Sequence, residues 1–229
     1  FYARQTQSAH AWNDAPTVFG GKDLEAGGSW MGVGANGRFA GLTNYRDPAL
    51  HQDGRRSRGQ LVSNFLTSTG SAEQVTSELH GAAEDYNPFN LLFGDSKRLF
   101  WYSNVPDSHC ELEPGVYGLS NHLLDTPWPK VEKCKARFKK AIEDSTVNPQ
   151  DLIKILQNNE VVPDNRLPDT GIDIDLERGL SPAFIQLPEY GTRATTVLLT
   201  RYDNVSEFWE LSYDKTGQPY GLVCQTLNG

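Results

Sequence analysis

Four side chains that could do chemistry together occupy consecutive positions: Asn44, Tyr45, Arg46 and Asp47. An amide, a phenol, a guanidinium and a carboxylate supply hydrogen-bond donors, acceptors and both signs of charge. We expect them at the end of a strand, because the following Pro48 lacks the N–H that a continuing ladder needs. A polar cluster in that position is typical of a binding or catalytic site. The alternative is a plain turn in which the Asn and Asp side chains bond their own backbone.

A β-hairpin is predicted to position this cluster. Residues 29–33 and 38–44 have strand-like patterns, and Asn36-Gly37 lies between them. Asn-Gly is the strongest short hairpin signal, because both residues tolerate a positive φ. The second strand is therefore expected to deliver the four polar residues at its far end.

The remaining patterns predict a mixed α+β fold, with strands toward both ends of the chain and helices grouped between them. Residues 1–12 are expected to be partly irregular, and 158–182, interrupted by prolines, to form a long loop. In the helix that starts near Thr126, Lys130 is expected on the solvent face. Helices are expected to begin near Ser57, Ser71, Thr126 and Asn148, and further strands to cover 17–19 (ending in a turn at Gly20-Gly21), 90–94, 98–102, 115–121, 195–202 and 205–213.

Size and composition restrict the class of protein. The 229 residues, 38% of them hydrophobic, predict a single domain over 1–229. A net charge of −8 argues against a general nucleic-acid binder. No apolar run approaches the ~20 residues of a membrane helix, so no membrane span is expected. The three cysteines, Cys110, Cys134 and Cys224, are far apart and odd in number. We therefore expect no disulfide framework, no metal site and a reducing, cytoplasmic location.

Seven short motifs follow one another along almost the whole chain. They are Phe-Tyr-Ala-Arg (1–4), Gly-Gly-Ser-Trp-Met-Gly-Val (27–33), Gly-Leu-Thr-Asn-Tyr-Arg (41–46), Arg-Gly-Gln-Leu-Val (58–62), Tyr-Gly-Leu-Ser-Asn (117–121), Thr-Pro-Trp-Pro-Lys (126–130) and Tyr-Gly-Thr-Arg (190–193). In this order they resemble the transport and Golgi organisation 2 family. It is also called the NRDE family, after an Asn-Arg-Asp-Glu motif near its N-terminus. That motif would lie just before Phe1, so the chain is expected to lack the family's first strand or two.

The resemblance implies the four-layer αββα sandwich of N-terminal-nucleophile hydrolases. In the cysteine branch of that fold, an N-terminal Cys attacks an amide and its own α-amino group acts as the base. By resemblance, the catalytic set includes Asn44 in the oxyanion hole, Asn121 near the substrate and Arg193 closing the constellation. These three residues are then expected at one opening between two stacked sheets. No cysteine lies near Phe1, so the sequence carries half of such a site. Hydrolysis of a small acyl-amide is therefore the alternative function.

The preferred function is intracellular small-molecule handling, with haem as a possible cargo. Members of the resembled family are implicated in haem trafficking, and the family is also linked to mitochondria and the Golgi. Haem needs an apolar slot and an axial ligand, for which the candidates are His51, His122 and Met31. Its propionates could meet Arg55, Arg56 and Arg58. The expected ligand-binding residues are Arg4, Trp30, Tyr45, Arg46 and Trp128. An ordinary surface or core role is the alternative for each of them.

Overall fold

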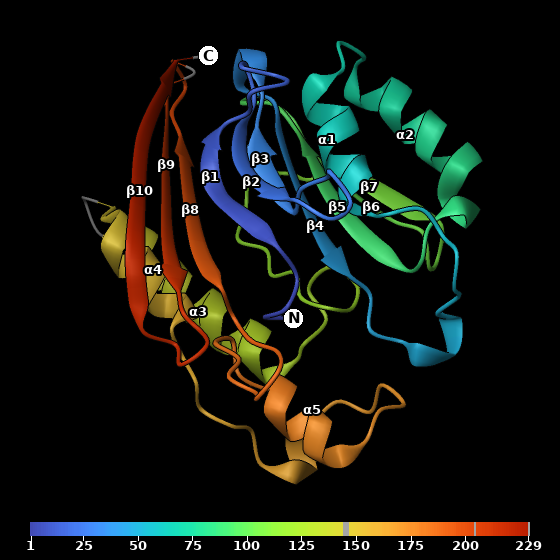
Figure 1. Ribbon diagram of the computed structural model, residues 1–229, viewed down its shortest axis with the longest axis vertical. Coiled ribbons are helices and arrows are strands. Elements are labelled where there is room, and N and C mark those ends of the chain that lie inside the picture. The colour runs from blue at the N-terminus through green and yellow to red at the C-terminus, as the bar shows by residue number, and fades with distance from the viewer. Residues whose placement is uncertain (144–146, 204, 229) are drawn as a thin grey trace.

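The computed structural model describes residues 1–143, 147–203 and 205–228. Within these residues the chain forms a mixed α+β fold with two antiparallel sheets (Figure 1). The larger sheet is a meander in which each strand pairs with the next one along the chain. Its seven strands are β1 (Thr6–Ala11), β2 (Phe19–Asp23), β3 (Met31–Val33), β4 (Phe39–Asn44), β5 (Phe89–Gly94), β6 (Leu99–Ser103) and β7 (Ser108–Glu111).

The smaller sheet lies at the C-terminal end of the chain. It contains β8 (Ala194–Thr200), β9 (Val205–Tyr213) and β10 (Pro219–Asn228), in the spatial order β10-β9-β8. The predicted C-terminal hairpin is thus confirmed, and its turn residue Asn204 lies outside the described residues. Both faces of this sheet are covered. Side chains of β9 alternate between buried and half-buried, with Phe208 and Glu210 on the more buried face.

The hairpin that presents the polar cluster is confirmed. β3 pairs with β4 through Met31↔Gly41 and Val33↔Phe39. Asn36 and Gly37 both have positive φ, at 58° and 68°, which is the conformation that makes Asn-Gly a hairpin signal. β4 then ends at Asn44, so the chain leaves the sheet where the four polar residues begin.

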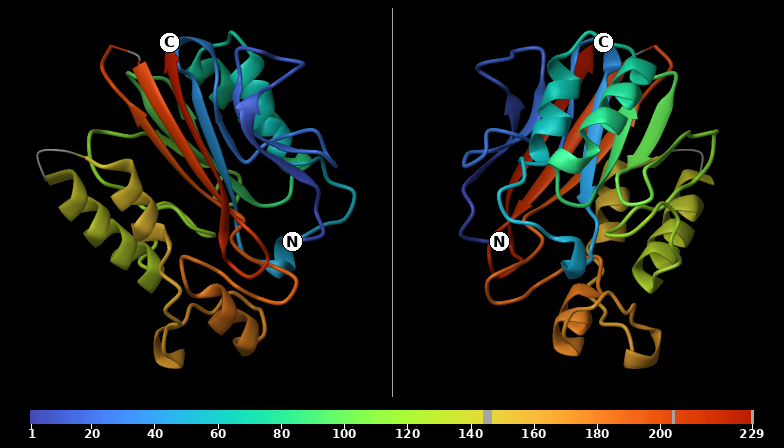
Figure 2. Two further views of the ribbon diagram at one scale, coloured as in Figure 1. Left: turned by 60° about the vertical axis from the view of Figure 1, so that its left-hand side comes forward. Right: turned by 90° about the vertical axis from the view of Figure 1, so that its right-hand side faces the viewer.

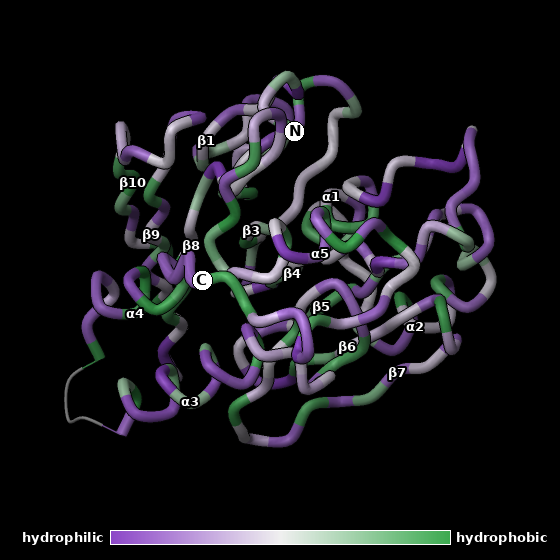
Figure 3. Tube along the Cα trace, turned by 90° about the horizontal axis from the view of Figure 1, so that it is seen from below, coloured by the Kyte–Doolittle hydropathy of each residue, from purple (hydrophilic) through white to green (hydrophobic). Residues whose placement is uncertain are grey.

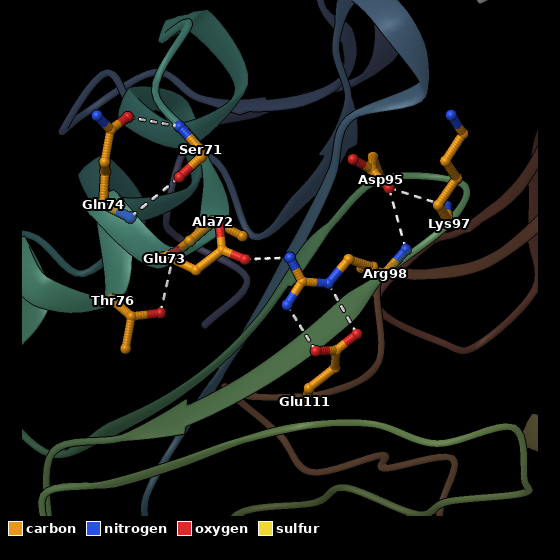
Figure 4. Close-up of polar contacts among 9 residues, drawn as sticks. All are labelled: Ser71, Ala72, Glu73, Gln74, Thr76, Asp95, Lys97, Arg98 and Glu111. Atoms are coloured by element: carbon orange, nitrogen blue, oxygen red, sulfur yellow. Dashed lines mark hydrogen bonds and ion pairs between the residues drawn. The ribbon is translucent and has the colours of Figure 1, made fainter.

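Of the five α-helices in the described residues, four lie on the outer faces of the two sheets, and α5 (Ile174–Leu180) lies beyond the ends of the strands (Figure 1). α2 starts with the capping box expected at Ser71, whose hydroxyl accepts the Gln74 N–H while the Gln74 side chain accepts the Ser71 N–H (Figure 4). Beside it, Arg98, the residue before β6, bridges Glu73 of α2 and Glu111 of β7 (Figure 4). The helices are α1 (Gly59–Thr67), α2 (Ala72–Ala82), α3 (Pro129–Glu143), α4 (Pro149–Leu156) and α5 (Ile174–Leu180), with short 3₁₀ turns at Ala35–Gly37, Pro48–Leu50, Ala83–Asp85 and Asp164–Arg166.

Three hydrophobic clusters among the described residues set the order of the layers. The first packs α1 and α2 against the larger sheet, with Phe93 and Tyr102 fully buried. The second joins the two sheets, with Phe19 packed edge-on against Phe208 at 5.2 Å between ring centroids. The third packs Leu152 and Ile153 of α4 against β8 and β9. The layers therefore run helices, sheet, sheet, helices (Figure 2), with the hydrophobic residues on the inner strands and mostly polar outer loops (Figure 3).

Several sequence predictions are wrong in detail. Residues 1–12 are partly irregular as expected, but Thr6–Ala11 form β1, which was not predicted. This strand lacks an apolar alternation, and three of its six residues are exposed. Gly20 and Gly21 continue β2 instead of turning. A Cβ on Gly20 would lie 2.6 Å from the Met31 carbonyl oxygen, so glycine there lets β3 approach closely. β7 and β10 were also not predicted.

Two further predictions are reversed: a predicted strand is a loop, and a predicted loop contains a helix. Residues 115–121 form no strand, because Asp125 holds the segment in a loop. Its carboxylate accepts the Gly118 N–H at 2.7 Å and its own N–H bonds the Gly118 carbonyl at 2.8 Å. Conversely, the predicted loop over 158–182 contains α5, whose first turn is capped by the Asp173 side chain. No helix in the described residues is long and apolar enough to cross a membrane.

Candidate functional site

A cavity of about 790 Å³ opens between the two sheets and α3. Its size falls in the ~300–1,000 Å³ range of small-molecule pockets. Three half-exposed residues, Tyr117, Phe138 and Leu156, lie at its surface, each about 40% exposed. Most of the lining is apolar. It includes Met31 and Phe39 from the hairpin, Leu99 from β6, Leu119 from the 115–121 loop, Val131, Cys134 and Phe138 from α3, Leu152, Ile155 and Leu156 from α4, and Val197, Leu198 and Leu199 from β8.

The cavity follows the free edge of β8. Residues 196–200 all line it, although successive side chains of a strand point to opposite faces. Five consecutive residues can line one space only when that space runs along the strand edge. In the described residues, β8 pairs with β9 on its other side only. Viewed from below, β8 with α3 and α4 lies on one side and β5–β7 with α2 on the other (Figure 3).

Two lysines bring positive charge to this apolar space. Lys135 forms an ion pair with Asp125 at 2.6 Å. Lys130 donates a hydrogen bond to the Leu180 carbonyl at 2.9 Å. Burial lowers the pKa of Lys130 to about 8, and the nearby Arg46 guanidinium acts in the same direction. Lys130 is thus an amine whose charge is poorly solvated, not the solvent-face residue that the sequence predicts.

Asn44 and Asn121 meet at one end of the cavity. The Asn121 side-chain amide donates to the Asn44 carbonyl oxygen at 3.0 Å. The N–H of Arg46 donates to the Asn121 carbonyl at 2.7 Å. Asn121 lines the cavity, whereas the side chain of Asn44 is exposed. The 115–121 loop is therefore fastened to the end of β4 by bonds in both directions.

Arg193 belongs to a different group of contacts. Its guanidinium donates to the Arg4 carbonyl at 2.6 Å and to the Phe1 carbonyl at 3.4 Å. In the described part of the chain, Arg193 forms no hydrogen bond with either asparagine. The ring of Phe1 packs against Tyr190 at 5.3 Å, so the first residue lies beside the segment that leads into β8. The structure thus brings two of the three predicted catalytic residues together and holds Arg193 at Phe1.

Arg46 is the most buried charge of the predicted cluster. It pairs with Glu177 of α5 at 2.9 Å, with side-chain exposures of 11% and 3%. Its guanidinium also lies over the Trp128 ring at 5.1 Å. The other oxygen of Glu177 accepts bonds from the N–H and hydroxyl of Thr170. This ion pair fastens the 158–182 segment to the end of β4. Tyr190 also interacts electrostatically with the Arg46 guanidinium.

Comparison with known proteins shows the family of this chain. A family model described as Transport and Golgi organisation 2 matches residues 1–215. The chain belongs to the transport and Golgi organisation 2 family. The Transport and Golgi organization protein 2 homologs of Bos taurus and Homo sapiens are each 34% identical over 93% of this chain and 83% of their own length. The Drosophila melanogaster Transport and Golgi organization protein 2 is 29% identical over 92% of this chain and 82% of its own length.

The three residues that the sequence suggested as axial haem ligands are placed very differently. Met31 lines the cavity. Both ring nitrogens of His122 are engaged, by the Tyr45 hydroxyl at 2.8 Å and the Thr126 hydroxyl at 2.8 Å. His51 lies 3.9 Å from Asp53 and is exposed. No set of three or more His, Cys, Asp or Glu side chains in the described residues is arranged to hold a metal ion.

Five other residues that were expected to contact a ligand lie outside the lining of the cavity. Trp30 packs its ring across Gly21 of β2. Arg4 pairs with Asp23 at 2.6 Å on the surface. The arginines expected to meet propionates also have other partners: Arg55 bonds Gln52, Arg56 pairs with Asp85, and Arg58 donates to the Pro88 carbonyl. None of these five residues lines the cavity.

Sequence reasoning missed the residues that supply polarity to the cavity. Lys130 and Lys135 belong to a basic helix whose charged side chains were expected to face solvent. The available signal for Lys130 was its place at the end of the family motif at 126–130. Glu177 lay in a segment predicted to be irregular. For Glu177, the available signal was the Asp173 cap followed by a short helical pattern.

Proposed function

We propose that this member of the transport and Golgi organisation 2 family is a carrier for an apolar small molecule with an anionic group, with haem as the preferred cargo. The observation that carries the proposal is the large apolar cavity with two lysines in its wall. A carrier for such a ligand needs a space for its flat or elongated apolar part and a cation that pairs with its anionic group. The cavity offers both, and its surface residues are half-exposed, so a ligand can enter.

The lining also contains side chains that can meet haem iron. Met31, Tyr117 and Cys134 are of types that serve as axial ligands. The Tyr117 hydroxyl already donates to the Glu113 carbonyl at 2.9 Å, and burial raises the pKa of the Cys134 thiol. The thioether of Met31 needs no deprotonation and is therefore the preferred candidate. The propionates would meet Lys130 and Lys135 in place of the arginines predicted from the sequence.

Titration with haemin, followed by absorbance, tests the carrier function. We expect a saturable shift of the Soret band at micromolar protein, with one haem bound per chain. Met31→Leu keeps the volume of the side chain and removes the sulfur, so it should alter the position of the band more than the affinity. A Soret band that stays that of free haemin at micromolar protein would contradict the proposal.

The layer order supports a finer assignment of the fold. Helices, two stacked sheets and helices are the layers of the αββα sandwich that we propose, of the N-terminal-nucleophile hydrolase type. The contact between Asn44 and Asn121 favours a second candidate function, an N-terminal-cysteine amide hydrolase. Asn121 lines the cavity, and its amide could polarise a carbonyl group there. A strand leading into Phe1 would arrive beside Arg193, at the start of the free edge of β8.

The thiols of this chain do not serve that second candidate. Burial raises the pKa values of Cys110 and Cys134, which is the opposite of nucleophile activation. The third thiol, Cys224, is exposed on β10 and does not line the cavity. We therefore expect no hydrolysis of small acyl-amides by the 229-residue chain. An active-site cysteine placed ahead of Phe1 should introduce turnover that iodoacetamide abolishes. Turnover that is unaffected by alkylation would exclude the cysteine mechanism.

A further inference from the structure

Lys130 lies between two cavities and is used by neither of the functions above as a nucleophile. It lines the 790 Å³ cavity and also a second one of about 560 Å³, bounded by the start of α3 and residues 158–163. Its amine bonds the Leu180 carbonyl at 2.9 Å and lies 5.8 Å from the centre of the Trp128 ring. In the part of the chain that the structure describes, Lys130 forms no ion pair.

The charged groups around Lys130 come from three elements. Arg46, at the end of β4, disfavours a second positive charge. Glu177 of α5 favours it, but its carboxylate is already occupied by Arg46 and Thr170. Cys134, one turn further along α3, is held neutral because burial raises the pKa of its thiol. Burial, which is the largest cause, and the Arg46 charge together lower the pKa of Lys130 to about 8. At pH 7 about a tenth of the amine is then neutral, against about one part in three thousand for an ordinary lysine.

We propose that Lys130 captures an apolar aldehyde in the cavity as an imine. The neutral amine attacks the carbonyl carbon, the C=N bond replaces the C=O bond, and the oxygen leaves as water with the two amine hydrogens. No oxidant, reductant or co-reactant is required. The apolar walls favour an alkyl or polyene aldehyde over a polar one, and they exclude water that would hydrolyse the imine.

The inference shares the cavity with the proposed carrier function but needs neither haem nor an anionic ligand. The two therefore fail separately. Haemin titration measures the carrier function on unmodified protein, whereas covalent labelling measures the reactivity of one amine.

Lys135 provides the matched control. It lies on the same helix and lines the same cavity, but its ammonium is held in the ion pair with Asp125. The native chain is incubated with octanal and sodium cyanoborohydride at pH 7, and modified lysines are mapped by peptide mass spectrometry. We expect the reduced adduct at Lys130 to form at least about ten-fold faster than at Lys135, because of the larger neutral fraction. Its rate should rise with pH and level off above about pH 8.

Two variants complete the test. Lys130→Arg should lose the rapid adduct and Lys135→Arg should retain it. The N-terminal peptide is followed separately, because the Phe1 amine also has a lowered pKa. Equal labelling of Lys130 and Lys135 in the native chain would overturn the proposal, even if a variant failed to fold. So would an adduct rate at Lys130 that keeps rising up to pH 10.

Discussion

The two sides of the larger sheet are built in opposite ways. On the side of α1 and α2, the sheet is sealed by aromatic packing, with Phe93 stacked on Phe100 at 5.8 Å and edge-on to Phe65 at 5.3 Å. On the side of α3, the second sheet touches it around Phe19 and Phe208 and then leaves the 790 Å³ cavity. In the described residues, the first region is a large aromatic core, whereas the second combines a smaller packed cluster with a cavity. We propose that the sealed side supplies stability and that the hollow side is the place where a ligand binds.

Substitution of one aromatic residue on each side gives the largest expected contrast. Phe93→Ala removes a fully buried ring from the sealed side and should lower the free energy of unfolding by about 4 kcal/mol. Phe138→Ala, at the rim of the cavity and 39% exposed, should cost about 1 kcal/mol. Urea denaturation monitored by circular dichroism measures both. Equal losses would show that the two sides are packed alike.

The ion pair between Arg46 and Glu177 is the most buried ion pair in the described residues. Glu177→Gln leaves Arg46 charged in a buried position and should destabilise the protein by about 3 kcal/mol. Because the pair fastens the 158–182 segment, protease cleavage in that segment should increase as well. A loss of stability without new cleavage would mean that the pair does not hold this segment.

Glu210 tests the contact between the two sheets through pH. Its carboxyl group is 1% exposed, accepts the Ala9 N–H at 2.7 Å and bonds the Thr196 hydroxyl, and burial raises its pKa. Because the pKa of Glu210 is raised in the folded protein, the contribution of Glu210 to stability is complete below its unfolded-state pKa near 4.5. That contribution falls as the pH rises through the folded-state pKa. Glu210→Gln keeps both hydrogen bonds without the charge.

The Glu210→Gln variant should therefore be more stable than the native chain at pH 7, by on the order of 1 kcal/mol. The difference should shrink toward zero at pH 4. Thermal unfolding of both proteins at the two pH values measures this. A difference that grows as the pH falls would mean that the carboxylate is stabilised by its surroundings.

The helix cap on the sealed side gives the smallest expected effect. Ser71→Ala removes the hydroxyl that accepts the Gln74 N–H (Figure 4) and should cost about 1 kcal/mol. Haemin affinity should not change, because α2 lies across the sheet from the cavity. Weaker haemin binding in this variant would show that the two sides are coupled.

Features set by short-range signals were predicted well, whereas features that depend on partners outside their own segment were predicted poorly. Asn36-Gly37 and the Ser71–Gln74 box are short-range features that require particular backbone angles, so the sequence reveals them directly. β1 depends on its pairing with β2, and the 115–121 loop depends on Asp125, so in both cases the deciding partner lies outside the segment. The meeting of Asn44 with Asn121 was expected by resemblance, whereas Lys130 facing inward depends on how α3 packs against two sheets. Helical spacing in one sequence cannot show that packing.

Haemin titration of two tryptophan variants tests most directly whether the cavity beside β8 is the binding site. Leu156→Trp, on a leucine that lines the cavity and is 40% exposed, should fill part of the space. Leu222→Trp is the matched control, because this leucine is 52% exposed on β10 and does not line the cavity. We predict that Leu156→Trp weakens haemin binding at least about ten-fold, equivalent to ~1.4 kcal/mol, while Leu222→Trp binds as the native chain does. Equal affinity of the two variants would contradict the account.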